Sequence, residues 1–318
     1  RDEEENELID ATHELWKILA KHHDPNLRNR KSCADFVAQV LVFGLFFAHT
    51  RATPSGSSPS ARSALISQFW TTDAVSAAGH LRPFKALVDH LTGVLAGTSD
   101  LALWTQQCMQ VLAHAEFMGT ESGERDFHTL FEGFLEAFDN RIRFDRGAFY
   151  TPSALTAWMT RSADHLINSI YGHTMFELAE TIIDPCCGTG GFLESLIVNG
   201  ERAPEVDLPT LVGFEVLPAP YALAHYRLDR VALSENYEGA IRILLTDTLS
   251  DNLHDLPDEF DSLFFQELSE ANSIVQPPLR VVIGNPPSIN SEASGASRRE
   301  IHDMLEVFRP PKSHRGDR

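Results

Sequence analysis

The sequence predicts an α/β protein, in which an all-helical N-terminal domain is followed by a parallel β-sheet covered by helices. Residues 1–140 place apolar side chains at helical spacing and show no strand pattern. After about residue 145, short apolar runs alternate with helical segments, and this alternation is typical of a parallel sheet with helices on both faces. We therefore expect two domains, residues 1–140 and residues 141–318.

The composition narrows the class of protein. Of the 318 residues, 43% are hydrophobic and 22% are charged, which is typical of a globular protein. The longest apolar run, residues 36–48, is too short to span a bilayer, so no membrane association is expected. The four cysteines show no C-x-x-C spacing, which argues against zinc and against a disulfide framework. We expect a cytoplasmic protein without a metal site.

The net charge of −19 restricts any interaction with nucleic acid. A protein that binds nucleic acid without a partner usually presents a basic face to the phosphates. Any contact of this chain with DNA is therefore expected in a small local patch or through a part of the protein other than these residues.

A polar side chain ends or follows each of the four apolar runs that we interpret as strands. The runs are residues 181–184, 210–215, 241–246 and 280–284. In a parallel α/β sheet the ligand lies at the carboxyl ends of the strands. The side chains found there are, in chain order, Asp184, Glu215, Asp247 and Asn285.

A glycine-rich turn follows the first run, in "DPCCGTGGF". It is not a phosphate-binding loop, because no lysine follows, and Leu193 stands where a dinucleotide-binding motif has its third glycine. Asp184 before the turn disfavours a pyrophosphate and favours a ligand with a cationic amine. A purely structural strand-to-helix turn also fits the spacing.

The next strand ends allow similar interpretations. Glu215 lies about 30 residues past the glycine turn, where doubly wound folds bind ribose hydroxyls. Asp247 fits either a ligand contact or a helix cap. In "RVVIGNPPSIN", Asn285 precedes Pro286 and Pro287, and the prolines make the backbone stiff and fix its carbonyl groups.

Five stretches together resemble the DNA amino-methyltransferases that produce N6-methyladenine. They are "GAFYTP" (147–152), "DPCCGTGGF" (184–192), "GFEVLPAPYALA" (213–224), "TDTL" (246–249) and "NPPS" (285–288). The order of these motifs and the helices ahead of them resemble large single-chain restriction-modification and phage-defence enzymes. The resemblance implies a Rossmann-like domain that depends on S-adenosylmethionine.

The resemblance also implies roles for residues around the cofactor. The loop 149–152 would fold over its methionine end, with Thr151 capping a helix that Pro152 begins. Asp184 would face the amine, Glu215 the ribose and Asp247 the adenine amino group. The full set of expected cofactor contacts is Phe149, Tyr150, Thr151, Pro152, Asp184, Pro185, Cys186, Gly188, Gly190, Phe192, Glu215, Val216, Asp247 and Thr248.

The expected catalytic residues are Asn285, Pro286, Pro287 and Ser288. The exocyclic amine of adenine is a weak nucleophile, because its lone pair is delocalised into the ring. Hydrogen bonds accepted by Asn285 Oδ1 and by the Pro286 carbonyl would make that amine more nucleophilic, on a base flipped out of the duplex. Ser288 departs from the family pattern, which has an aromatic residue that stacks on the base. Another aromatic residue, a weak activity or a redirected site would each account for it.

The resemblance further implies about three more strands after residue 318, and then a target-recognition domain that contacts double-stranded DNA. We therefore expect these residues alone to bind cofactor weakly and to methylate little, and other restriction or defence subunits are possible partners. Two alternatives stay open. One is a non-catalytic or redirected scaffold that binds S-adenosylmethionine, and the other is a methyltransferase acting on protein glutamine or on RNA.

Overall fold

The computed structural model describes part of the chain, and all of that part lies in one of the two compact units into which the chain divides, residues 1–127 together with 150–286. The described residues are 30–52, 58–61, 64, 99–114, 151–202, 206–248, 265–275 and 280–286. The expected site residues Phe149, Tyr150, Pro287 and Ser288 lie outside them. The expected domain boundary near residue 140 lies outside them too and stays a prediction.

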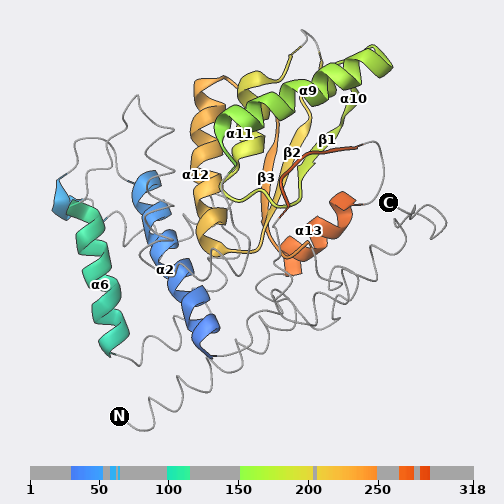
Figure 1. Cartoon of the computed structure of the whole chain (residues 1–318). Helices are drawn as coiled ribbons and strands as arrows, with labels where there is room; N and C mark the ends of the chain where they lie inside the picture. The colour runs from blue at the N-terminus through green and yellow to red at the C-terminus, as the bar shows by residue number, and fades with distance from the viewer. Residues whose placement is uncertain are drawn as a thin grey trace, which may run out of the picture. The chain divides into compact units, whose positions relative to one another are not determined.

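A parallel four-stranded sheet forms the centre of the described structure, with the order β3-β2-β1-β4 (Figure 1). The strands are β1 (Thr181–Asp184), β2 (Thr210–Glu215), β3 (Ile241–Leu245) and β4 (Arg280–Val282). All four predicted strands are therefore confirmed, although β3 ends one residue and β4 two residues before the predicted boundaries at residues 246 and 284. The order changes direction between β1 and β4, and such a switch point is where ligands bind in open α/β sheets.

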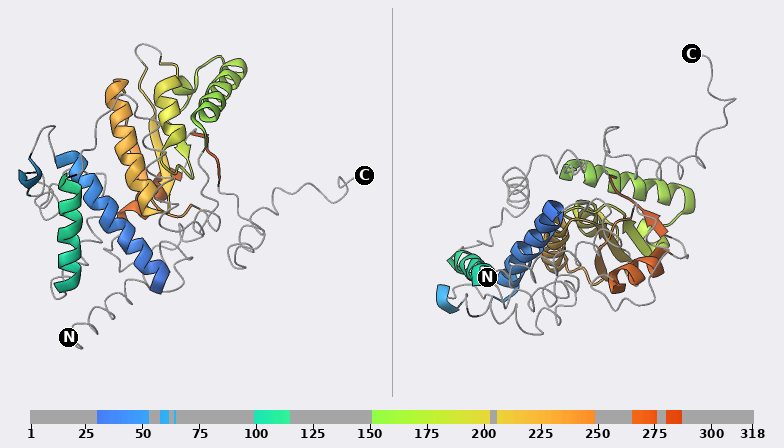
Figure 2. Two further views of the ribbon diagram at one scale, coloured as in Figure 1. Left: turned by 60° about the vertical axis from the view of Figure 1, so that its left-hand side comes forward. Right: turned by 90° about the horizontal axis from the view of Figure 1, so that it is seen from below.

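Helices cover both faces of this sheet, as the alternating pattern predicted (Figures 1 and 2). One face carries α9 (Ser153–Tyr171), α11 (Gly191–Asn199) and α12 (Pro218–Ser234), and the short α10 (Met175–Leu178) follows α9. On the other face, α13 (Phe265–Val275) packs Ala271 into a cluster with Ile183, Val212, Phe214 and Leu244. The sequence analysis did not predict α13.

The described parts of the N-terminal region are helical. They include α2 (Arg30–Ala52) and α6 (Ser99–His114), and α2 packs against α12. The Phe46 and Tyr226 rings meet edge to face there, with centroids 5.8 Å apart. The rest of the expected helical domain lies outside the described residues. None of the described helices has the length and apolar character needed to cross a membrane.

Gly213, in the middle of β2, allows the glycine-rich turn to pack directly on the sheet. A Cβ atom at this position would lie 2.7 Å from Cys187 Sγ and 2.8 Å from Ile243 Cδ1. Cys187 is itself held there, because its backbone N–H donates to the Phe214 carbonyl at 2.9 Å. The close approach of strand and turn therefore requires a residue without a side chain at position 213.

We expect Gly213→Ala to destabilise the protein by about 1–3 kcal/mol, since the added methyl group overpacks a buried contact. Urea denaturation of the variant and the wild type measures the difference in unfolding free energy. Gly191→Ala is the matched control, because a Cβ atom there meets its nearest neighbour, Thr156 Cγ2, at an ordinary 3.9 Å. Equal stability of Gly213→Ala and wild type would contradict this account of the turn.

Candidate functional site

The carboxyl ends of the strands gather the polar residues that the sequence analysis singled out. Asp184 ends β1, Glu215 ends β2, and Asn285 follows β4 by three residues. The Ile283 N–H donates to the Ile183 carbonyl at 2.9 Å, so the chain after β4 continues beside β1 toward Asn285. The predicted assembly of these side chains at one edge of the sheet is therefore observed.

The glycine-rich turn leads from β1 into α11 through two residues with positive φ. Gly188 has φ 55° and Gly190 has φ 83°, a region that disfavours side chains. The Gly190 N–H donates to the Cys187 carbonyl at 2.8 Å, and α11 begins at the next residue. Glycine at these positions thus lets the chain reverse beside the ends of β1 and β2.

Asp184 is a buried carboxylate that is only partly satisfied. Its side chain is 1% exposed, and Oδ1 accepts a hydrogen bond from the Cys186 N–H at 3.1 Å. Its Oδ2 is buried and has no hydrogen-bond partner among the described residues. Burial raises the pKa of Asp184 to about 7, the Cys186 hydrogen bond opposes that rise, and the Glu215 charge adds to it. A buried carboxylate in this state is suited to a cationic group such as an amine.

Gly284 brings the chain before Asn285 against this carboxylate. A Cβ atom at position 284 would lie 2.5 Å from Asp184 Oδ1 and 3.2 Å from Pro185 Cδ. Such an approach excludes any side chain at this position. The backbone leading to Asn285 is therefore in direct contact with the group expected to face the cofactor's amine.

Glu215 fixes the other side of the glycine turn. Its Oε2 accepts from the Gly188 N–H at 3.0 Å, and its Oε1 accepts from the Leu217 N–H at 2.7 Å. A carboxylate oxygen accepts more than one hydrogen bond, so this anchoring is compatible with the predicted contact to ribose hydroxyls. Val216 follows Glu215 and is half-buried, whereas Phe192 in α11 is almost fully buried.

The loop after β3 is joined to the glycine turn by Thr248, whose hydroxyl donates to the Pro185 carbonyl at 2.8 Å. Asp247 is half-buried between Thr246 and this anchored threonine. The residues after Thr248 lie outside the described ranges, so both interpretations of Asp247 stay open.

The two cysteines of the turn are neutral thiols. Burial, with a further contribution from Asp184, raises the pKa of Cys186 to about 12 and that of Cys187 well above its ordinary value. Thiols with a pKa raised in this way are poor nucleophiles at neutral pH. In the part of the chain that the structure describes, no group of His, Cys, Asp or Glu side chains could hold a metal ion.

Thr151 makes a contact that the sequence analysis did not predict. Its Oγ1 accepts a hydrogen bond of 3.1 Å from Asn285 Nδ2. The predicted capping of a helix by Thr151 is wrong, because α9 begins at Ser153 and Pro152 is its N-cap, with no side-chain capping bond. Thr151 lies one residue too early to act as the cap, and its hydroxyl contacts Asn285, in the segment after β4, instead.

A buried ion pair between α11 and α12 stabilises the glycine-rich turn. Arg227 of α12 donates to Glu194 of α11, and it also donates to Thr189 Oγ1 at 3.4 Å. Both charged side chains are buried. Sequence reasoning missed this pair, although an arginine within the largely apolar run "YALAHYRL" was a signal for it.

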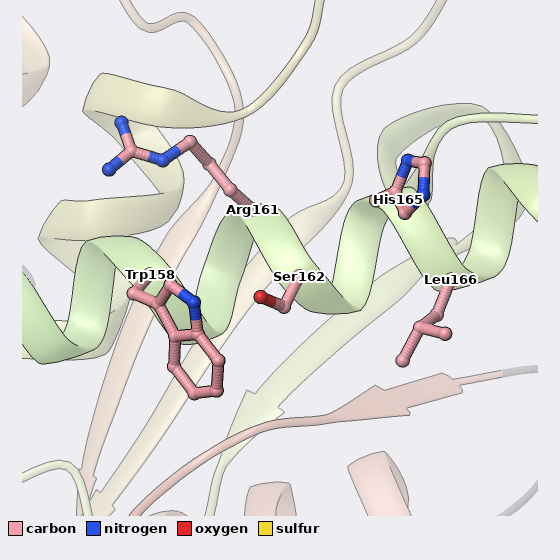
Figure 3. Close-up of a pocket in the computed structure, with 5 residues that line it drawn as sticks. All are labelled: Trp158, Arg161, Ser162, His165 and Leu166. Carbon is pink, nitrogen blue, oxygen red and sulfur yellow. The ribbon is translucent and has the colours of Figure 1, made fainter.

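An open depression lies elsewhere, along α9, and is lined by Trp158, Arg161, Ser162, His165 and Leu166 (Figure 3). Trp158 and Leu166 project to one side of the helix and Arg161 and His165 to the other. None of the expected site residues lines this depression, and all five lining residues come from one helix. We assign the site to the strand ends, where the buried carboxylate and the positive-φ glycines meet.

The parallel sheet with helices on both faces is consistent with a Rossmann-like methyltransferase fold. The family model described as N-6 DNA Methylase matches residues 123–310, which is more than half of the chain. The chain belongs to this family. No curated protein sequence matches it.

Three solved structures show a similar fold. The DrdV–DNA complex matches with a TM-score of 0.65 at 20% identity, over 96% of this chain and 29% of that one. A nuclease-deletion mutant of the Type ISP restriction-modification enzyme LlaGI, in complex with a DNA substrate mimic, matches with a TM-score of 0.61 at 19% identity, over 96% and 25% of the two chains. The ATP-dependent Type ISP enzyme LlaBIII bound to DNA matches with a TM-score of 0.59 at 16% identity, over 96% and 22%. At identities this low, the structural similarity shows a shared fold alone. The chain spans less than a third of each matched chain.

We predict that binding of S-adenosylmethionine to the complete natural protein weakens as the pH falls from 7.5 to 5.5. Protonation of Asp184, with a pKa of about 7, removes the negative charge that would face the amine. A single group of this pKa weakens binding by roughly 10- to 30-fold over that range. Calorimetric titration at several pH values measures the dissociation constants.

Asp184→Asn should bind weakly and lose this pH dependence, whereas Glu238→Gln, at an exposed carboxylate, should keep it. A wild-type affinity that stays constant between pH 5.5 and 7.5 would contradict the role of Asp184.

We further predict that Arg227→Met destabilises the fold by about 3–5 kcal/mol, because it leaves the Glu194 charge buried and uncompensated. The double variant Arg227→Met/Glu194→Met should recover most of that loss, since both charges are then replaced by apolar groups. Chemical denaturation of the wild type, the single variants and the double variant gives the four free energies. A double variant no more stable than Arg227→Met would contradict this interpretation.

Proposed function

We propose that this protein is a DNA methyltransferase of a restriction-modification system, which methylates N6 of a flipped-out adenine with S-adenosylmethionine as donor. Membership of the N-6 DNA methylase family supports the reaction class. The observation that carries the proposal is the approach of Gly284 to the Asp184 carboxylate. It brings Asn285, the residue expected to bind the adenine amine, next to Asp184, the residue expected to face the cofactor's amine.

The residues at the strand ends fit the proposed cofactor. The buried Oδ2 of Asp184 has no described partner, and a cationic amine would supply one. Glu215 is anchored beside the glycine turn, where a ligand's ribose would lie, and Asp247 and Thr248 border the turn from β3. When bound, the sulfonium compound would supply an activated methyl group. The chain's own task is to bind it, to orient it and to present the acceptor.

Asn285 and Pro286 would present the acceptor amine. The Asn285 Nδ2 donates to Thr151, so its Oδ1 is the acceptor end that remains for the substrate. The carbonyl of Pro286 would accept a second N–H, and the prolines limit its movement. Two such hydrogen bonds would favour a tetrahedral amine whose lone pair is available for attack, and in-line positioning would supply much of the remaining rate enhancement.

DNA binding by the complete protein is part of the proposal. Two of the matched structures are described as bound to DNA and a third as bound to a DNA substrate mimic. Because this chain carries a net charge of −19, we propose that most phosphate contacts come from outside it. The division into a helical domain, residues 1–140, and a catalytic core, residues 141–318, a cytoplasmic location and a role in phage defence belong to the same proposal.

Ser288 favours one alternative function. An aromatic residue stacking on a flipped base is worth roughly 1–3 kcal/mol, and serine does not supply this interaction. A scaffold protein that retains the cofactor site but transfers no methyl group would tolerate serine at this position.

The decisive experiment incubates the complete natural protein with methyl-labelled S-adenosylmethionine and mixed-sequence duplex DNA, followed by digestion to nucleosides. We expect label in N6-methyldeoxyadenosine, and a loss of about 100-fold or more in Asn285→Ala, because a hydrogen bond made in the transition state is removed. Asn168→Ala, at an exposed position on α9, is the matched control and should retain activity.

A protein that binds the cofactor but labels no nucleoside would overturn the proposal and favour the scaffold function. Label that persists in Asn285→Ala would instead contradict the assigned role of that side chain.

A further inference from the structure

We propose that Thr151 is a positioning residue for Asn285: its hydroxyl holds the plane of the Asn285 carboxamide, and the acceptor amine then selects the oxygen end of that group. This inference rests on the proposed function and extends it to a residue that the sequence analysis expected to contact the cofactor and to cap a helix. It depends on the hydrogen bond from Asn285 Nδ2 to Thr151 Oγ1, 3.1 Å long and formed between residues 134 positions apart.

The backbone around Asn285 is already constrained by its neighbours. The Ile283 N–H donates to the Ile183 carbonyl at 2.9 Å, and Gly284 lies against Asp184 and Pro185. Pro286 follows and restricts the backbone on the other side. The side-chain torsions of Asn285 are therefore the conformational freedom that this residue retains.

That remaining freedom matters because a carboxamide has a donor end and an acceptor end. Asn285 is exposed, and the terminal torsion of asparagine is broad and roughly two-fold, so an unrestrained side chain would sample both orientations. With the amide nitrogen toward the substrate, two N–H donors would oppose each other. With the nitrogen bonded to Thr151, the oxygen is the end presented to the substrate.

A hydroxyl can bond either end of a carboxamide, so Thr151 alone holds the plane of the group rather than its direction. The acceptor amine then selects the direction of the carboxamide, because its N–H groups donate hydrogen bonds and therefore require the oxygen end. Thr151 thus removes the cost of ordering Asn285 when the base arrives. Positioning of this kind affects the rate of transfer more than the binding of cofactor.

The helix does not account for the hydroxyl at position 151. The first turn of α9 is closed by the Pro152 carbonyl, which accepts from the Leu155 N–H at 2.8 Å and the Thr156 N–H at 3.0 Å. No side chain caps the helix. Loss of the Thr151 hydroxyl should therefore leave the stability of α9 unchanged, which separates a positioning role from a structural one.

The test compares Thr151→Val, Thr151→Ser and the control Ser153→Ala in the complete natural protein. Thr151→Val removes the hydroxyl that accepts from Asn285, at nearly constant side-chain volume. We expect kcat for DNA methylation to fall by about 10- to 100-fold. The dissociation constant of S-adenosylmethionine should change by less than about threefold. Thr151→Ser keeps the hydroxyl and should restore most of kcat. Ser153→Ala alters an exposed hydroxyl in the first turn of the same helix and should change neither quantity.

A second measurement does not depend on activity. In protein labelled with 15N-asparagine, the side-chain amide signals of Asn285 are identified by their loss in Asn285→Ala. We expect their exchange with solvent to rise by about tenfold in Thr151→Val and to stay near the wild-type rate in Thr151→Ser, because a hydrogen-bonded amide is protected.

The outcomes are distinguishable. If the wild type methylates no DNA, the proposed function fails, and the amide exchange still decides whether Thr151 orders Asn285. Unchanged exchange in Thr151→Val overturns the inference whatever the activity. Unchanged kcat together with faster exchange also overturns it, because the ordering would then have no catalytic effect. Should Thr151→Val fold poorly, Thr151→Ala replaces it in both measurements.

Discussion

The contact between the Asp184 carboxylate and Gly284 is the constraint on which the candidate site depends. It joins the ends of two neighbouring parallel strands, β1 and β4, at the point where the strand order of the sheet changes direction. Any side chain at position 284 would push the chain away from β1 and move Asn285 from its place. The proposed cofactor end and the proposed acceptor end of the site are therefore linked through one glycine.

This arrangement has an energetic cost. The pKa of Asp184 is about 7 in the folded protein against an ordinary value of 3.8, so folding takes up a proton on this group between those pH values. Stability from this group is present at low pH and is lost as the pH rises through about 7, because the buried carboxylate must then ionise. A buried charge of this kind is typical of functional sites, where binding of a ligand offsets a locally unfavourable fold.

Polar contacts around the glycine-rich turn offset part of the cost of burying the Asp184 carboxylate. Glu215 bonds two backbone N–H groups, Thr248 bonds the Pro185 carbonyl, and Arg227 reaches Thr189 from the buried ion pair. These contacts come from three different elements and converge on one turn. The turn is thus held in place from β2, from the loop after β3 and from α12.

The sequence by itself determined the four strands and the polar residues at their ends, because the length and apolar character of a buried strand are local properties of the chain. The positive φ of Gly188 and Gly190 was predictable for the same reason. The sequence analysis missed α13, a helix of 11 residues, and it assigned Thr151 to a helix cap. Only the tertiary structure decided the partner of Thr151 and the pairing of Arg227 with Glu194, since those contacts join residues 134 and 33 positions apart. No local pattern encodes which distant side chain will lie within hydrogen-bonding distance once the sheet has formed.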